Sequence, residues 1–238
     1  MIRNTLLRAL LLSAVLAFVG SSLARAGSTS SPQVMVMLPP KAVAPSDLRR
    51  QVQQLRAEGL IGTAMRFDAT PGQEKHGFSL LLILQATSED AVSRLEKAEH
   101  WPKDARVRRV DASFKSGDIS KAAPEAVFEV NLYRLKASEQ RYKQFVGEYI
   151  SPLMDAQIAE GLMRSYTMYI ERGGEGDRQA VLLKAYLDTP TYETKMPDAK
   201  LAIRKRLESE HPTYPKWHPI KDEVRYDLTH TVAKRRKE

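Results

Sequence analysis

Hydrophobic and polar positions along this chain follow two periods, one typical of strands and one of helices, and the two alternate in a regular order. Residues 34–38 form an apolar run that two prolines end, which predicts a short buried strand. Residues 46–59 carry apolar side chains at helical spacing, between a serine suited to an N-cap and a glycine suited to a helix end. Further strands are expected at 62–68, 78–85 and 106–114, with a second helix after Ser88. The first half therefore has the predicted order β-α-β-β-α-β.

The same order returns in the second half of the chain. Strands are expected at 126–135, 162–171, 179–188 and 223–232, and helices after Ser138 and across 190–211. In the first of these helices Ser151 has the character of an N-cap and a proline follows it, so we expect the helix to break there and restart. Pro197 is expected to split the second helical region, which is longer than its counterpart in the first half.

Short motifs recur at matching places in the two halves. The tripeptide Glu-Gly-Leu occurs at 58–60 and again at 160–162. A tryptophan precedes an Arg-x-Asp-x-Ser/Thr pattern twice, as Trp101 with 109–113 and as Trp217 with 225–229. The recurrence predicts two copies of one domain of about a hundred residues. The expected organisation is a signal peptide (1–26), a disordered leader (27–33), a first repeat (34–116), a linker (117–124), a second repeat (125–233) and a basic tail (234–238).

The N-terminal segment has the pattern of a secretory signal peptide. Arg3 and Arg8 precede an apolar run, and Ala24-Arg25-Ala26 is a small-x-small cleavage site, so the mature chain is expected to begin at Gly27. An uncleaved anchor is the alternative. No later apolar run is long enough to predict a membrane span in the mature chain. The sequence contains no cysteine, which excludes disulfides, thiol catalysis and thiolate metal sites and favours a periplasmic or secreted bacterial protein.

The net charge of +8 overstates the basic character of the folded part. The signal peptide contributes three arginines and no acid, and much of the remaining excess lies in residues 234–238, which are expected to fray. A nucleic-acid-binding protein concentrates basic charge on a structured face. The sequence therefore predicts no nucleic-acid partner.

The order β-α-β-β-α-β is the ferredoxin-like plan, a four-stranded antiparallel sheet with both helices on one face. Its other face is left uncovered, yet the strand at 34–38 has no polar side, so we expect the sheets of the two copies to pack against each other. In this the chain resembles the dimeric α+β barrel superfamily, in which two ferredoxin-like units pair as dimers or as tandem repeats. The predicted fold class is α+β, two tandem ferredoxin-like units forming an intramolecular dimeric α+β barrel.

The predicted site lies in the second repeat, facing the space between the sheets. In its first strand Phe128, Val130 and Leu132 alternate with Glu129, Asn131 and Tyr133, and we assign the apolar set to the helices and the polar set to that space. In its last strand strict alternation opposes Arg225, Asp227 and Thr229 to Tyr226, Leu228 and His230. The expected ligand-binding residues are Arg225, Asp227, Glu129, Asn131, Tyr133, Trp217 and His230.

The roles of these residues have ordinary alternatives. The arginine of the last strand would hold an anionic or carbonyl group, with the aspartate as a base. Ion pairing on a sheet surface explains the same pattern. The tryptophans could wall a pocket, or simply fill the core beneath a helix end.

Three functions stay open at this stage. The first is an exported protein that binds a small, partly apolar ligand in the cavity between the sheets. The second, implied by the family resemblance, is a cofactor-independent or haem-dependent oxygenase, in which His218 or His230 would ligate the iron. The third is a non-enzymatic module that docks a protein on an open sheet face. No metal site and no cofactor other than this haem are expected, and a homodimer is left open.

Overall fold

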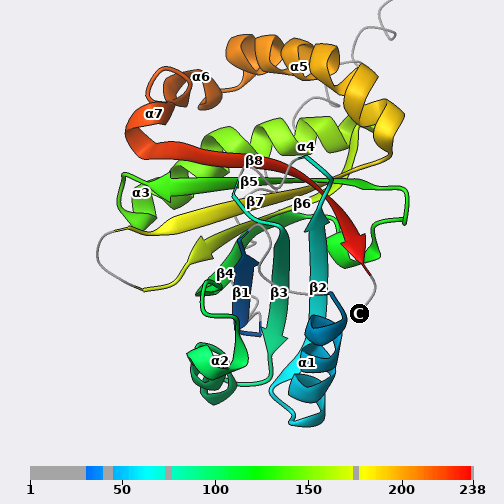
Figure 1. The fold of residues 1–238 in the computed structure, drawn as a ribbon. Helices are drawn as coiled ribbons and strands as arrows, with labels where there is room; N and C mark the ends of the chain where they lie inside the picture. Colours follow the sequence, from blue (N-terminus) through cyan, green and yellow to red (C-terminus); the bar gives the residue numbers. More distant parts are fainter. Residues whose placement is uncertain (1–30, 40–44, 73–76, 174–176, 237–238) are drawn as a thin grey trace, which may run out of the picture. The chain divides into compact units, whose positions relative to one another are not determined.

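Eight antiparallel strands close into a barrel in the computed structural model, which describes residues 31–39, 45–72, 77–173 and 177–236 (Figure 1). The strands are β1 (Gln33–Leu38), β2 (Ile61–Ala69), β3 (Leu80–Ala86), β4 (Arg106–Ser116), β5 (Val127–Leu135), β6 (Met163–Glu171), β7 (Gln179–Tyr186) and β8 (Arg225–Arg236). The mixed α+β class and the barrel agree with the sequence prediction. The predicted signal peptide lies outside the described residues.

Helices cover the outside of the barrel. They are α1 (Pro45–Ala57), α2 (Glu89–Leu95), α3 (Glu139–Phe145), α4 (Ser151–Ala159), α5 (Met196–Glu210), α6 (Tyr214–Trp217) and α7 (Lys221–Val224). Figure 1 shows α1 and α2 outside the strands of the first half, and α3, α4 and α5 outside those of the second. Within the described residues, no helix is long and apolar enough to cross a membrane.

The strand order around the barrel is β1-β3-β2-β8-β5-β7-β6-β4. The first half contributes the run β4-β1-β3-β2 and the second half the run β8-β5-β7-β6. The two runs join edge to edge, β2 with β8 and β4 with β6. Because each outer strand finds its partner in the other half, the hydrogen-bonding edges that an open sheet would expose are paired.

The interior of the barrel is a packed apolar core to which both halves contribute. Met35 and Phe67 meet Phe128 and Leu183 there, and the rings of Phe67 and Phe128 lie 5.0 Å apart. A cavity beside Met35 and Tyr169 has a volume of about 10 Å³, which is room for one water at most. The space between the sheets, which the sequence analysis expected to hold a ligand, is therefore filled with side chains.

The two faces of β5 are the reverse of the sequence assignment. Phe128, Val130 and Leu132 belong to the interior core, whereas Tyr133 packs in the core beneath the helices of the second half. Glu129 lies on that same outer face, because side chains alternate along the strand. The physical reason is that apolar side chains of both halves fill the interior beside β5, whereas the outer face places Lys184 next to Glu129.

The two helices of the second half do not break at their prolines. The helix from 139 to 159 passes through a π-helical turn, Val146–Ile150, and the one from 191 to 210 through another, Thr191–Lys195. The residue before each proline donates a wider hydrogen bond, from Ser151 N–H to the Val146 carbonyl and from Met196 N–H to the Thr191 carbonyl. Ser151 is helical (φ −59°, ψ −46°) and not a cap. The expected break and split are wrong because a π-turn accommodates the missing proline amide.

The recurring Glu-Gly-Leu tripeptide ends a helix in both halves, as predicted. Gly59 (φ 70°) and Gly161 (φ 67°) adopt the left-handed conformation. Leu60 N–H donates to the Leu55 carbonyl, and Leu162 N–H donates to the Gln157 carbonyl, each at 3.0 Å. This is the Schellman arrangement, which glycine adopts without a steric cost.

Strand β8 continues through Lys234 to Arg236, where the sequence analysis expected a frayed tail to begin at 234. The cause is the pairing with β2, in which Lys234 is opposite Asp68 and Arg236 is opposite Arg66. Asp68 also accepts from the Arg236 Nε at 3.2 Å. Backbone pairing and this ion pair hold the basic residues in the barrel wall.

Candidate functional site

The last strand of each half contains a β-bulge, in β8 opposite β5 and in β4 opposite β6. In β8, Thr229 is opposite Leu132 and Asp227 is opposite Tyr133, so Leu228 has no partner. In β4, Ala112 is opposite Tyr169 and Phe114 is opposite Met168. A bulge inserts one residue and reverses the side-chain alternation beyond it. Arg225 and Asp227 therefore lie on the same outer face as His230, and the strict alternation predicted for β8 is wrong.

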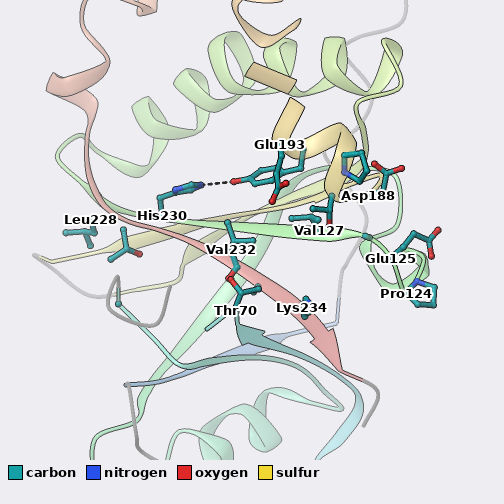
Figure 2. Close-up of a pocket in the computed structure, with 17 residues that line it drawn as sticks. Thr70, Pro124, Glu125, Val127, Asp188, Glu193, Leu228, His230, Val232 and Lys234 are labelled. Atoms are coloured by element: carbon teal, nitrogen blue, oxygen red, sulfur yellow. Dashed lines mark hydrogen bonds between the residues drawn. The ribbon is translucent and has the colours of Figure 1, made fainter. Parts of the chain in front are cut away.

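A groove of about 1410 Å³ lies over β8, and we call it the β8 groove (Figure 2). Val127, Leu228 and Val232 give it an apolar lining. Figure 2 shows His230 and Val232 following one another along β8, with Glu193 and Asp188 on the segments across from them. The first half contributes Thr70, whose hydroxyl donates to the Val232 carbonyl at 3.0 Å. The groove thus spans the junction of β2 and β8.

His230 connects the groove to a buried ion pair. Its Nε2 lies 3.3 Å from Glu129 Oε1 and 3.5 Å from the Tyr192 hydroxyl, the contact dashed in Figure 2. Glu129 is 4% exposed and Lys184 is 3% exposed. The Lys184 ammonium donates to the same Glu129 oxygen. The His230 side chain is 52% exposed. A chain of polar contacts therefore leads from the buried Lys184 through Glu129 to the surface of the groove.

Burial and charge fix the ionisation of these groups. Burial raises the pKa of the Glu129 carboxyl, but the Lys184 ammonium and the hydrogen bond to His230 outweigh it, so the pKa lies well below its ordinary value. Burial raises the pKa of the Tyr192 hydroxyl, and the nearby Glu129 carboxylate raises it further. Burial is the main cause that lowers the pKa of the Lys200 ammonium, on α5, to about 8, and the neighbouring Lys184 ammonium adds to it. At neutral pH Glu129 is therefore a carboxylate and Tyr192 a neutral phenol.

The structure brings Glu129, Asn131 and His230 together. Asn131 is opposite His230 in the pairing of β5 with β8. Its Oδ1 is buried and makes no hydrogen bond within the described part of the chain. Of the predicted site residues, His230 lines the groove and these two lie next to it.

Tyr133, Arg225 and Asp227 form a second group near the start of β8. The Arg225 guanidinium lies 3.7 Å from the centre of the Tyr133 ring, and its Nε lies 3.2 Å from Asp227 Oδ1. The Arg225 side chain is 11% exposed while that of Asp227 is 72% exposed. Burial raises the pKa of the Tyr133 hydroxyl to about 12. None of the three lines the β8 groove, and the geometry is that of an arginine packed on aromatic rings.

Trp217 is a core residue and does not form the wall of a pocket. Its indole N–H donates to Glu148 Oε2 at 2.7 Å, and its ring packs edge-on against Phe145 at 5.6 Å. Trp101 is buried in the same manner, with its N–H donating to the Leu95 carbonyl at 2.6 Å. Neither tryptophan lines the groove.

Three residues of the site were not predicted from the sequence: Lys184, Tyr192 and Lys200. Lys184 had a usable signal, because a single lysine within the apolar strand 180–186 requires a buried partner of opposite charge. The other two come from the extra helical region, and only the tertiary fold brings them over β5 and β8.

Within the described ranges, no group of three or more His, Asp or Glu side chains could hold a metal ion. His218 lies apart from the groove and bonds through Nδ1 to Glu208 at 2.6 Å. The groove does not suit a haem either. Among the described residues its charged lining consists of Glu125, Asp188, Glu193 and Lys234, and three carboxylates would repel the two propionates of a haem.

No protein-family model matches this chain, and no curated protein matches it in sequence. A monooxygenase-like protein from Fusobacterium nucleatum subsp. nucleatum has a similar solved structure, with 11% identity, coverage of 88% of this chain and 94% of that one, and a TM-score of 0.50. A monooxygenase-like protein from Lactobacillus acidophilus NCFM has 10% identity, coverage of 86% and 93%, and a TM-score of 0.49.

A chlorite dismutase-like protein has 11% identity, coverage of 87% and 96%, and a TM-score of 0.46. These structures are of the dimeric α+β barrel type. At such low identity the similarity concerns the fold alone.

Proposed function

We propose that the chain binds a small, partly apolar molecule in the β8 groove, with His230 as its main polar contact. The observation that carries this proposal is the position of a half-exposed histidine, backed by a buried carboxylate, in a groove with an apolar lining. A concave site with a few convergent polar groups is the usual form of a ligand pocket. The binding function is the one expected from the sequence, at a different place on the barrel.

The charges around the groove favour a neutral or cationic ligand. In the described part of the groove, Glu125, Asp188 and Glu193 are opposed by one lysine, Lys234. Asp188 is partly engaged, because its carboxylate accepts from the Thr191 N–H at 2.8 Å. An anionic ligand would meet net repulsion at this rim, weakened by solvent.

A thermal-shift titration tests the binding proposal. We use 2-tetralone as the probe, a neutral bicyclic ketone that combines an apolar body with one hydrogen-bonding group. The parent chain is expected to gain thermal stability with increasing probe, because a ligand that binds only the folded state stabilises it. His230→Ala is expected to lose most of this gain.

The matched control is His218→Ala, since His218 is similarly exposed and lies outside the groove. It is expected to behave as the parent does. Equal shifts in His230→Ala and the parent, or no shift in either, would overturn the proposal.

An oxygenase that needs no cofactor is the second candidate. The observation that favours it is the contact between His230 and the Glu129 carboxylate, since oxygenation of an electron-rich aromatic begins with the removal of a proton. Oxygen uptake with an anthrone as substrate, lost in His230→Ala, would support it. The docking-module alternative required an uncovered sheet face, and the inner faces of the two halves pack together instead.

We also propose that the two halves are tandem ferredoxin-like units and that the chain is exported after cleavage between Ala26 and Gly27. The repeat is supported by the equal strand order of the two halves and by the two Glu-Gly-Leu helix ends. Export is supported by the sequence pattern of residues 1–26 alone. N-terminal sequencing of the protein expressed in a bacterium tests the cleavage site.

A further inference from the structure

We propose that His230 is a general base whose free Nδ1 removes a proton from the ligand, and that the buried Glu129–Lys184 pair holds the imidazole in the tautomer this requires. The inference rests on the proposed binding function and adds a reaction to it. The substrate class is a neutral molecule with an acidic C–H or O–H group, such as a ketone with an activated α-proton or a phenol.

The tautomer follows from the chemistry of the contact with Glu129. An ionised carboxylate can only accept hydrogen bonds, and the Glu129 oxygen lies 3.3 Å from the His230 Nε2. The proton must therefore be on Nε2. In a neutral imidazole this leaves Nδ1 with a free lone pair. The described residues give Nδ1 no hydrogen-bond partner, and His230 lines the groove.

Lys184 makes this arrangement possible. A buried carboxylate without a cation would be costly to ionise, and it would take up a proton or leave the core. The Lys184 ammonium, buried beside it, donates to the same oxygen that faces His230. Glu129 thereby keeps its charge and its orientation and can fix the tautomer of His230, as a buried carboxylate does for the histidine of a catalytic triad.

Tyr192 completes the site from the other side of the groove. Its hydroxyl lies 3.5 Å from the His230 Nε2, and it cannot donate to that nitrogen while the nitrogen carries a proton. Its own hydrogen is then available to a group in the groove, which Tyr192 also lines. A ketone oxygen placed there would accept from Tyr192 while its α-proton faces His230.

The reaction is a proton transfer that needs no co-reactant. The α-C–H bond of the ketone breaks, a bond from the proton to His230 Nδ1 forms, and the electron pair stays on the ligand as the enolate. The reverse step returns a proton to the carbon. In heavy water the returned hydron is deuterium, because His230 exchanges with solvent.

Hydron exchange of 2-tetralone in heavy water measures the reaction directly. Proton NMR follows the loss of the signal from the carbon between the ring and the carbonyl. The parent chain is expected to raise the exchange rate at least about tenfold over His230→Ala, within the range of general-base catalysis. Tyr192→Phe is expected to lower the rate and leave the His230 tautomer unchanged.

The outcomes separate this inference from the binding proposal. If 2-tetralone stabilises the parent chain and yet exchanges no faster with it than with His230→Ala, binding stands and the base is wrong. If the probe causes no thermal shift at all, the binding proposal is the one that fails. The tautomer can still be tested without a ligand, as follows.

Nitrogen NMR of histidine-labelled protein reports which ring nitrogen of His230 carries the proton. The parent is expected to give the signature of a protonated Nε2, and protonation on Nδ1 would overturn the inference. The double variant Glu129→Leu/Lys184→Met tests the positioning role, since removing both charges avoids an unpaired buried ion. It is expected to stay folded and to lose both the fixed tautomer and the exchange activity. Retention of both would show that the pair plays no positioning part.

Discussion

At the scale of single residues, the choice of polar side chains was better predicted than their direction. Glu129 stands out in the sequence because it interrupts an apolar strand, and the structure brings it into contact with His230. The face assigned to Glu129 was wrong, because the period of two gives which residues share a side and not which side faces the core. Because of the bulge at Leu228, Arg225 and Asp227 lie on the same face as His230. No residue in that strand predicts a bulge.

Lys200 gives a prediction at this scale, because its pKa is lower in the folded chain than its ordinary value of 10.5. Below about pH 8, the pKa of Lys200 in the folded chain, burying the protonated amine lowers the free energy of unfolding. This destabilisation decreases as the pH rises toward 10.5, the ordinary pKa. Lys200→Met is therefore expected to raise the free energy of unfolding by about 1–2 kcal/mol at neutral pH. The gain should shrink at about pH 10.

Urea unfolding at both pH values measures the effect. Lys205→Met, an exposed lysine on the same helix, serves as the control and is expected to change little at either pH. A gain for Lys200→Met that is as large in alkaline as in neutral solution would contradict the explanation by burial.

At the scale of elements, the order and type of strands and helices followed from hydrophobic period and from helix-end residues. The continuity of two helices was not predicted, and in both cases a proline is involved. Pro152 and Pro197 were expected to interrupt helices, but the chain remains helical by widening one turn before each of them. The π-turn Thr191–Lys195, which precedes Pro197, contains Tyr192, a residue of the candidate site.

The glycines that end elements give the prediction at this scale. Gly161→Ala is expected to cost about 1–2 kcal/mol, because an added Cβ meets nothing within 4 Å and only the left-handed conformation (φ +67°) is penalised. Gly59→Ala should cost about the same for the same reason. Gly117→Ala is expected to cost more, since its Cβ would lie 2.6 Å from the Arg164 carbonyl oxygen.

Chemical unfolding of the three variants provides the comparison. A cost for Gly117→Ala no larger than those of the other two would mean that the turn after β4 can shift away from β6. Equal but negligible costs at Gly59 and Gly161 would mean that the helix ends rearrange to avoid the left-handed conformation.

At the scale of the whole molecule, the barrel joins the halves through their cores as well as through their edges. The need to bury two apolar sheet faces was visible in the sequence, and so was the pairing of the halves. The edge-to-edge closure of the barrel was not visible in the sequence, because pairing between strands far apart in sequence leaves no local pattern. The ion pairs across one junction are exposed, such as Arg172 with Asp111 at 2.8 Å, and pairs of this kind contribute about 0–1 kcal/mol each.

The shared interior core predicts that neither half unfolds alone. Phe128→Ala removes a ring that packs on Phe67 of the other half and is expected to cost about 3–5 kcal/mol. The whole transition should move to lower temperature and stay single. Arg172→Ala should cost less than about 1 kcal/mol, and less still in high salt.

Scanning calorimetry distinguishes the outcomes. Two separate transitions, with only one displaced by Phe128→Ala, would contradict the idea of a shared core. A large, salt-independent cost for Arg172→Ala would mean that the junction of β4 and β6 depends on charge more than its exposure implies.

The pairing of β8 with β2 has a consequence for proteolysis. The last residues of this strand, Lys234, Arg235 and Arg236, are cleavage sites for trypsin-like proteases, and their backbone is protected only while the strand stays in the barrel wall. A cut after Lys234 would remove Arg236 and its contact with Asp68, shorten the junction between the halves and loosen the strand that carries His230. Trimming of a few residues would thus weaken the closure of the barrel and the wall of the groove together.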